Sequence, residues 1–498
     1  MADLFSKLDD YGYSEVYSFG MPGHKRKYDL TDFYEYYYKH DVTESKIFDN
    51  LHNPSGILQE CMKDAARVFG ADESFYLVNG SSSGIFASIM SLVPKGGKLL
   101  ASRFSSKAVY DAAIIRNANI SYIFTDTDIE LGINAPVTLD DIEECVGNNK
   151  YDAVFLTSPT VCGYTADIKE IADYLHEKKI PLIVDASYGA HFGFADFLPE
   201  SACSQGADVV VMNIANSLPA PRQTGLLHIN GTLVDREKIV LYLRMFQSHD
   251  PSYVLMAGLD DCISYLETGN AEEKWQTFRE MRKELSESLK DLKYIGVIDH
   301  FSNPWVEMGK MIIYSKSTFI DGKGLYDRLV DKHDIEPMMS MPDFVLFNLT
   351  LFDTKEGLDK LSEALHNMDE KLTRKEEGLE DTISLGSLAK LFDVTEKGDG
   401  SSATFIKTIY PQFRGNKVKV NICDAVDMPS KAVKVNMSKG LVSKSFISLY
   451  PYGQHIVAPG EEISQDALTL IGHYRRHGFK IDGINEDFIE VIDQNLSR

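Results

Sequence analysis

Cysteines are few in this sequence and stand far apart along it. The 498 residues include six, which form no CxxC pair and no Cys/His cluster at the spacing of metal ligands. They are Cys61, Cys145, Cys162, Cys203, Cys262 and Cys423. We therefore expect reduced thiols in a cytoplasm, and neither a disulfide framework nor a metal site.

Long apolar runs are missing as well. No stretch approaches the roughly 18 consecutive apolar residues of a membrane span. The N-terminal stretch MADLFSKLDDYGYSEVYS is charged where an export signal would be apolar. The sequence predicts a cytoplasmic protein that is neither exported nor inserted in a membrane.

Basic residues are also fewer than acidic ones. Lys and Arg number 51 against 74 Asp and Glu, which gives a formal net charge of -23. A surface this acidic repels the phosphates of nucleic acids and the headgroups of anionic lipids. We expect small molecules or proteins as partners, and no nucleic acid or membrane.

The length of the chain predicts several domains, because one domain usually has roughly 100–200 residues. An N-terminal segment over residues 1–50 precedes a large domain over 51–290. A small α+β domain over 291–375 and a C-terminal α+β domain over 380–498 follow, separated by the charged stretch TRKEEGLEDT.

The large domain alternates short apolar strands with helical segments. The strands include KLLAS, AVFLTSP, PLIVDAS and DVVVMNI, and the helices include SKAVYDAAIIRN and DIKEIADYLHEKK. Strands this apolar are buried on both faces, as in a doubly wound sheet with parallel strands. The pattern predicts an α/β fold.

The segment VNGSSSG is a strand, a tight turn and a helix start. Free backbone N–H groups and the helix dipole attract an anion there, and the hydroxyls of Ser81, Ser82 and Ser83 can add hydrogen bonds. The pattern is typical of a phosphate site. Taken alone, however, serines at the start of a helix are usually just caps.

The segment PLIVDASYGAHFGF places Asp185 at the carboxyl end of a strand, where open α/β sheets bind ligands. A buried aspartate there can pair with the protonated nitrogen of a pyridine ring, or it can be a helix cap or loop anchor. The turn SFGMPGHKRK adds a basic cluster of His24, Lys25 and Arg26, although most surface clusters of this kind have no function.

Several motifs together resemble one family in their order along the chain. They are FGMPGHKRK, DVTES with DNLHNPSGI, FGADESFYLVNGSSSG, LTSPTVCGYTADIKEIADYLHEKKIPLIVDASYGAHFGF, SLPAPRQTGLLHI, QSHDPSYVLMAGLD and SLYPYGQHIVAPGEEI. The sequence is similar to the pyridoxal-phosphate-dependent ornithine/lysine/arginine decarboxylases over about residues 15–475. The resemblance implies the aspartate-aminotransferase fold: a mostly parallel seven-stranded sheet in the large domain, and homodimers with active sites at the subunit interface.

The resemblance also implies roles for particular residues. Ser81, Ser82 and Ser83 would bind the cofactor phosphate, and Asp185 would keep the pyridine nitrogen protonated. Ser187 is small enough to lie under the ring, and Tyr188 can offer its hydroxyl to the ring oxygen. Asn213 belongs to the same cofactor-binding set.

The sequence departs from the family where covalent chemistry takes place. Family members have Ser-Thr-His-Lys where this chain reads Asn213, Ile214, Ala215 and Asn216. Asn216 therefore stands at the position of the Schiff-base lysine, and an amide nitrogen cannot form the imine that an amine forms. Ala215 replaces a histidine, Ser106 replaces the ring-stacking histidine, and Tyr188 replaces the histidine of an Asp-Glu-Ala-His run.

Changes in three separate motifs indicate natural loss, and neither Lys107 nor Lys25 fills the vacancy, because family members share both. Our first hypothesis is a pseudoenzyme that acts by association, as a homodimer or higher homo-oligomer, or as a heteromer with an active paralogue. The second is an enzyme that binds pyridoxal phosphate noncovalently or through a substitute lysine. The third is a binding module for another phosphorylated or amino-acid ligand. We expect no covalently bound cofactor.

Overall fold

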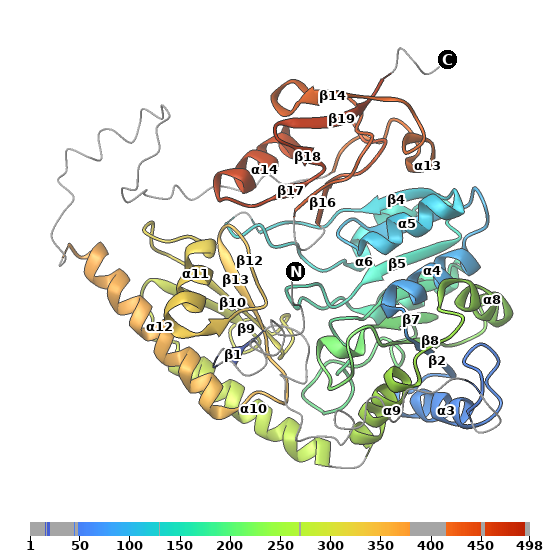
Figure 1. The fold of residues 1–498 in the computed structure, drawn as a ribbon, viewed down its shortest axis with the longest axis horizontal. Coiled ribbons are helices and arrows are strands. Elements are labelled where there is room, and N and C mark those ends of the chain that lie inside the picture. The colour runs from blue at the N-terminus through green and yellow to red at the C-terminus, as the bar shows by residue number, and fades with distance from the viewer. Residues whose placement is uncertain are drawn as a thin grey trace, which may run out of the picture.

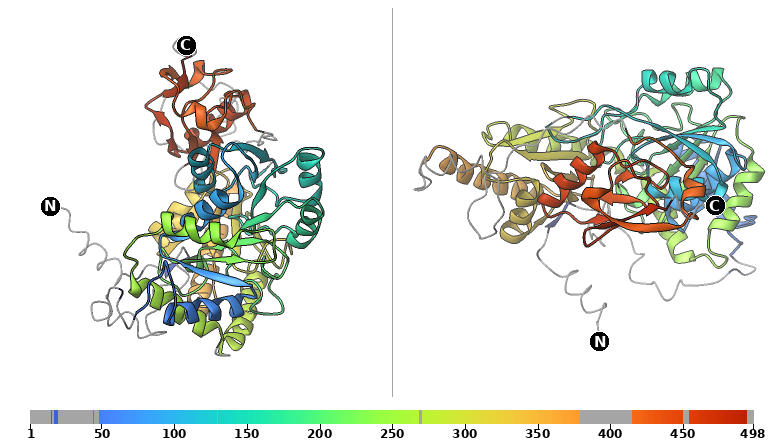
Figure 2. Two further views of the ribbon diagram at one scale, coloured as in Figure 1. Left: turned by 90° about the vertical axis from the view of Figure 1, so that its right-hand side faces the viewer. Right: turned by 90° about the horizontal axis from the view of Figure 1, so that it is seen from above.

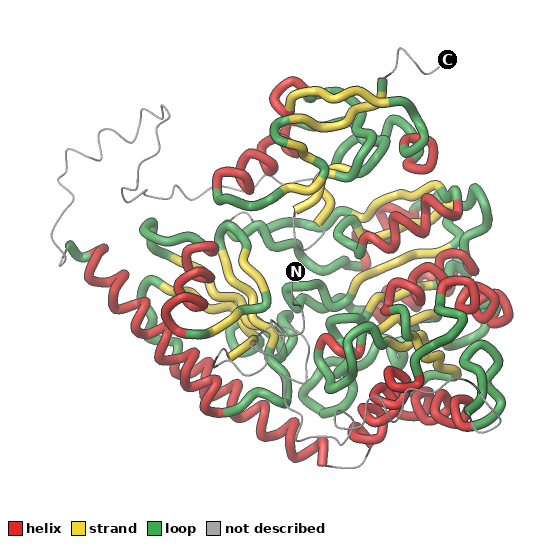
Figure 3. The backbone as a smooth tube through the Cα atoms, in the orientation of Figure 1, coloured by secondary structure: helices red, strands yellow, loops and turns green. Residues whose placement is uncertain are grey.

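The computed structural model describes residues 17–19, 48–128, 130–267, 270–378, 415–449 and 454–493, together with Glu15 and Glu44. The basic cluster of His24, Lys25 and Arg26 lies outside the described residues. Figure 3 shows strands enclosed by helices in the larger part of the molecule, and two smaller groups of strands beside it.

The large sheet has seven strands in the order β2-β8-β7-β6-β5-β3-β4. They are β2 (Glu73–Leu77), β3 (Lys98–Ser102), β4 (Asn119–Ile123), β5 (Ala153–Thr157), β6 (Leu182–Asp185), β7 (Val209–Met212) and β8 (Gly225–Ile229). Only β8 runs antiparallel to its neighbours, β2 and β7. The expected mostly parallel seven-stranded α/β fold is confirmed.

Helices cover both faces of this sheet (Figure 1). They are α3 (Ile57–Phe69), α4 (Gly80–Leu92), α5 (Lys107–Arg116), α6 (Leu139–Val146), α7 (Ile168–Glu177), α8 (Arg236–Phe246) and α9 (Tyr253–Glu267). Alternate residues of β5 join different cores: Val154 packs with α3, α6, α7 and α9, whereas Phe155 packs with α4, α5 and α8. This two-sided burial explains why the strand sequences are apolar throughout.

A second sheet, antiparallel and in the order β12-β13-β10-β9, follows in the chain. The helices and strands of this part of the chain are α10 (Asn270–Ser288), β9 (Ile295–Asp299), β10 (Lys310–Ser315), α11 (Gly322–His333), β11 (Ile335–Glu336), β12 (Met339–Ser340), β13 (Phe344–Asn348) and α12 (Lys355–Glu376). The long helices α10 and α12 lie side by side along it (Figure 1). Strand β1 (Tyr17–Ser18) pairs with β11, which joins the N-terminal part to this group.

The C-terminal group consists of two three-stranded sheets and one longer helix. Its elements are α13 (Ile422–Ala425), β14 (Ser430–Lys434), β15 (Ile447–Leu449), β16 (Gln454–Val457), α14 (Gln465–Arg476), β17 (Ile481–Asp482), β18 (Ile484–Asn485) and β19 (Phe488–Ile492). It lies against the β4 and α5 edge of the large sheet (Figures 1 and 2). Among the described residues, no helix has the length and apolar character to cross a membrane.

A buried ion pair fastens this C-terminal group to the large sheet. Arg103 follows β3 directly, and its Nη1 and Nη2 lie 2.6 and 2.9 Å from the two carboxylate oxygens of Glu461. Both side chains are fully buried. Glu461 also accepts hydrogen bonds from the backbone N–H of Ala458 and from Nδ2 of Asn416. These bonds offset the desolvation of the two charges.

Replacing Glu461 with glutamine should lower the free energy of unfolding by about 3 kcal/mol, because the Arg103 charge would remain buried without its counter-charge. Urea unfolding followed by far-UV circular dichroism measures the loss. The control is Glu287→Gln, which breaks the exposed pair between Glu287 and Lys290 and should cost less than about 1 kcal/mol. Equal losses in the two variants would contradict the assigned role of the buried pair.

Candidate functional site

The expected site residues gather in one cavity of about 320 Å³ at the carboxyl ends of the parallel strands. Its walls come from the residues that follow β3, β5, β6 and β7, which is where open α/β sheets bind ligands. Seven of the expected residues line it: Ser81, Ser106, Asp185, Ser187, Tyr188, Asn213 and Asn216. Ser82, Ser83 and Ala215 do not.

The start of α4 forms one end of the cavity. The helix begins earlier than its sequence suggests, with Asn79 as the N-cap residue, so the serines occupy its first turn and none of them is the cap. Ser83 donates its hydroxyl hydrogen to the Gly80 carbonyl, at 2.8 Å, whereas Ser81 lines the cavity. Helix α4 packs closely on the sheet here, because a Cβ on Gly84 would lie 2.8 Å from the Leu77 side chain.

Arg222 is a cavity residue that sequence reasoning missed. It lies in the loop between η2 (Ile214–Asn216) and β8 and lines the same cavity as Ser81. Burial raises the pKa of Tyr188, and the nearby Arg222 charge opposes that rise. The available signal was its place in the motif SLPAPRQTG, where it is the only charged residue. With the N-terminus of α4, Arg222 gives this cavity the positive character that a phosphate requires.

Asp185 ends β6 and lies almost fully buried beside the cavity. Its Oδ1 accepts a hydrogen bond from the backbone N–H of Ser187, at 3.0 Å. Burial raises the pKa of this carboxyl above its usual 3.8, although hydrogen bonds from Ser187 act in the opposite direction. No ion pair of the described residues involves Asp185. A buried carboxylate in this position favours a cationic or hydrogen-bond-donating ligand.

Asn216 is a buried part of the cavity wall. Its Nδ2 donates to the backbone oxygen of Ser187, at 2.9 Å, and its own backbone oxygen accepts from Nδ2 of Asn348, at 2.9 Å. Position 216 therefore connects the loop after β6 to β13 of the second sheet. The neighbouring Ala215 is fully buried in the core and presents nothing to the cavity.

Ser187 lies at the centre of this arrangement. Its hydroxyl oxygen accepts from the backbone N–H of Asn213, at 3.1 Å, in addition to its bonds with Asp185 and Asn216. The Oδ1 atom of Asn213 is buried and has no hydrogen-bond partner among the described residues. A buried acceptor of this kind needs a donor, which a bound ligand can supply.

None of the described residues that line the cavity is a lysine. Ser106 lines it and also caps α5, where its hydroxyl accepts from the backbone N–H of Ala108. The next residue, Lys107, is half-exposed and pairs with Asp111, its Nζ lying 2.6 Å from Oδ1. Groups of His, Cys, Asp and Glu that could hold a metal ion are absent from the described part of the chain.

One buried lysine lies near the cavity without lining it. The Nζ atom of Lys310 is 5.3 Å from the centroid of the Tyr188 ring and donates to Oδ1 of Asn348. Lys310 starts β10, and only 1% of it is exposed. The sequence gives no sign of this burial, because lysine side chains are usually exposed.

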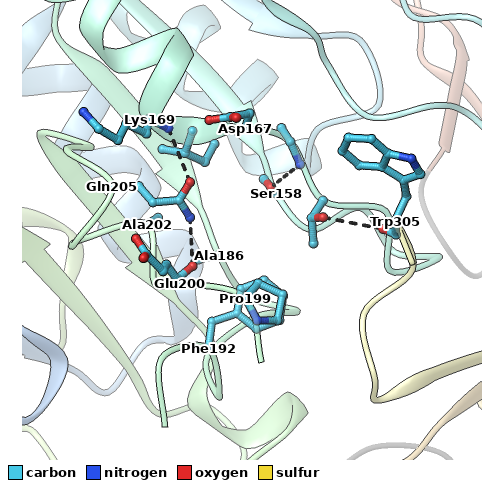
Figure 4. A pocket seen from close by; sticks show the side chains of 13 residues that line it. Ser158, Asp167, Lys169, Ala186, Phe192, Pro199, Glu200, Ala202, Gln205 and Trp305 are labelled. Carbon is cyan, nitrogen blue, oxygen red and sulfur yellow. Dashed lines mark hydrogen bonds between the residues drawn. The ribbon is translucent and has the colours of Figure 1, made fainter. Parts of the chain in front are cut away.

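Residues that follow β5 and β6 also line a second hollow, whose side chains are shown in Figure 4. Its walls include Ser158, Ala186 and the exposed indole of Trp305. Lys169 and Gln205 are joined there by a hydrogen bond from the Lys169 backbone N–H (Figure 4). None of the expected site residues lines this hollow.

Comparisons with known proteins find similar sequences in one family of decarboxylases. A family model described as Orn/Lys/Arg decarboxylase, major domain, matches residues 2–341. The uncharacterized protein YaaO of Bacillus subtilis is 30% identical over 348 residues, which cover 67% of this chain and 72% of YaaO. The arginine decarboxylase of the same organism is 25% identical over 501 residues, covering 98% of this chain and 96% of the relative.

Two solved structures have a similar fold. The lysine decarboxylase LdcF of Francisella novicida matches with a TM-score of 0.73 and 18% identity, over 98% of this chain and 80% of that one. The constitutive lysine decarboxylase of E. coli matches with a TM-score of 0.71 and 18% identity, over 98% and 81%.

The raised pKa of Asp185 predicts how stability depends on pH. Because the folded protein holds this proton more tightly than the unfolded chain, the free energy of unfolding should fall as the pH rises from 3.8 through the raised value. Asp185→Asn carries no charge, so above that window the ligand-free variant should be more stable than the wild type.

Urea unfolding at a series of pH values measures this difference, which should shrink toward the acid end. The exposed Asp196 provides the control, since Asp196→Asn removes a charge with no burial to relieve. An Asp185→Asn variant that is less stable than the wild type at every pH would contradict the assignment.

Proposed function

The chain belongs to the Orn/Lys/Arg decarboxylase family, and we propose that it is a catalytically degenerate member that acts by association. The observation that supports this proposal is the cavity itself. Most of the residues that the resemblance predicts to bind the cofactor line it, Asn216 stands at the predicted position of the lysine, and no lysine among the described residues lines it. A chain without that amine has no group at this position for covalent attachment of the cofactor.

The remaining residues fit pyridoxal phosphate as a noncovalent ligand. Ser81, the first turn of α4 and Arg222 would hold its phosphate, because they bring hydrogen-bond donors and positive charge to one cavity. Asp185, a buried acceptor without an ion pair in the described part of the chain, would hold the protonated ring nitrogen. When bound in such sites, this cofactor supplies an electron sink for carbanion chemistry.

The amide nitrogen of Asn216 is bonded to the protein and is not available for covalent chemistry. Its amide nitrogen is neutral, has its lone pair delocalised into the carbonyl, and donates to Ser187 O. Lys107 pairs with Asp111 on the surface. Neither side chain therefore offers a free amine to the ligand. These bonds favour a protein that holds a ligand without activating an amino acid.

A second candidate function is a decarboxylase or other lyase with a noncovalent cofactor or a substitute lysine. Lys310 is the observation that favours it, because its amine lies 5.3 Å from the ring of Tyr188, which lines the cavity. Against it, Lys310 does not line the cavity and donates to Asn348. Reaching the cavity would require Lys310 to give up that bond.

Borohydride reduction distinguishes the two functions. Wild-type protein with pyridoxal phosphate should show no cofactor-sized mass gain that maps to one lysine, whereas Asn216→Lys should gain one cofactor at residue 216. Assays with ornithine, lysine and arginine should show no carbon dioxide release from the wild type. A gain on Lys310, abolished in Lys310→Arg, would establish the substitute-lysine enzyme and overturn our proposal.

Association is tested by mass in solution. Light scattering should give at least twice the 55.9 kDa of one chain for the purified protein. Co-expression with an active arginine decarboxylase from the same cell tests the heteromer, which should elute as a mixed species. A self-dimer alone would exclude the heteromer, and a monomer in both experiments would exclude function by association.

A further inference from the structure

The orientation of the Asn216 amide is fixed by its partner. A backbone carbonyl only accepts hydrogen bonds, so the atom of Asn216 that lies 2.9 Å from Ser187 O must be the nitrogen Nδ2. The oxygen Oδ1 is therefore the atom left for a ligand, and it accepts no hydrogen bond from any described residue. Asn216 lines the cavity. The position of the lost amine now presents an acceptor.

A second amide oxygen belongs to the same wall. Asn213 also lines the cavity, and its Oδ1 is buried without a hydrogen-bond partner among the described residues. Its backbone N–H is already bonded to the hydroxyl of Ser187. In this wall the Asn213 oxygen is a buried acceptor without a donor, and the Asn216 oxygen accepts no hydrogen bond from a described residue. Neither side chain is cationic, so a bound donor can serve both oxygens.

The other charges of the cavity have counterparts elsewhere. Arg103 is neutralised by Glu461, and Arg222 with the N-terminus of α4 suits a phosphate. Asp185 suits a ring N–H. What remains to be matched is the wall of Asn213 and Asn216, and an ammonium group matches it because it has three donors, no acceptor and a positive charge.

The forms of the cofactor differ in one substituent of the ring, which is an aldehyde, an alcohol or an amine. This substituent would lie against the wall of Asn213 and Asn216. An aldehyde presents only an acceptor oxygen, which two amide oxygens repel, and an alcohol presents one neutral donor. An amine, protonated at neutral pH, presents three charge-assisted donors. The wall therefore discriminates among molecules that share the same ring and the same phosphate.

We propose that this cavity binds the amine form of the cofactor, pyridoxamine 5′-phosphate, noncovalently and in preference to pyridoxal 5′-phosphate. The inference rests on the proposed function, since it takes position 216 as the lost attachment point. The ligand class is a phosphorylated pyridine with a primary amine, and the side chains of Asn216 and Asn213 determine the preference.

Isothermal titration of the full chain with the three 5′-phosphates of pyridoxamine, pyridoxine and pyridoxal tests the proposal. The amine form should bind roughly ten- to a hundredfold more tightly than the aldehyde, the range expected for hydrogen bonds to a charged group, with the alcohol between them. Asn216→Leu keeps the side-chain size and removes the acceptor, together with the donor to Ser187 O, so the three affinities should converge to within about threefold. Asn148→Leu, at an exposed position outside the cavity, is the matched control and should keep the full preference.

Each outcome separates this inference from the proposed function. Equal affinities, tighter binding of the aldehyde without a reducible bond, or no binding of any form would overturn the inference and leave the pseudoenzyme standing. A borohydride-reducible bond between the aldehyde and a lysine would overturn the proposed function itself. If Asn216→Leu does not fold, the ranking of the three ligands on the wild type decides, because a wall without the proposed acceptors would not rank amine above alcohol.

Discussion

The hydrogen bonds of Ser187 hold the candidate site together. Its backbone N–H donates to Asp185, its carbonyl accepts from Asn216, and its hydroxyl accepts from the N–H of Asn213. The bonds with Asn216 and Asn213 join the end of β6 to the segment that follows β7, so the two strand ends cannot move apart without leaving buried polar groups unpaired. The position of every polar side chain in this wall follows from that constraint.

The same constraint explains why an asparagine is stable at position 216. A lysine amine in an empty cavity would be desolvated and would favour its neutral form at a cost in stability. The amide is neutral at every pH, and its nitrogen still supplies the donor that Ser187 O requires. Asp185 remains a buried acid without a paired cation in the described part of the chain, which costs free energy in the ligand-free protein. A site that had lost all ligands would gain stability by losing this acid, so its presence favours a cavity that still binds one.

Local sequence pattern predicted the parts of the structure that depend on local chemistry. The apolar runs located β5, β6 and β7, and Asp185 lies at a strand end as expected. Strand β8 was not predicted, because its antiparallel place between β7 and β2 depends on pairing with β2, which is far away in sequence. The roles of Ser82 and Ser83 were not resolved either, since the start of α4 at Gly80 turns only Ser81 toward the cavity. Arg222 has no periodicity to mark it, and its position depends on how the loop before β8 folds back.

Arg103 links the cavity wall to a residue that is far away in the chain. It lines the cavity beside Ser106, yet its counter-charge, Glu461, is 358 residues away in the C-terminal group. A buried guanidinium is stable only while that carboxylate remains in place, so the C-terminal group and the cavity wall are ordered by the same interaction. The second sheet reaches the opposite wall through Asn348 and the backbone of Asn216. Because contacts from all three parts of the chain hold the cavity walls, the shape of the cavity depends on the whole fold and not on the residue at position 216 alone.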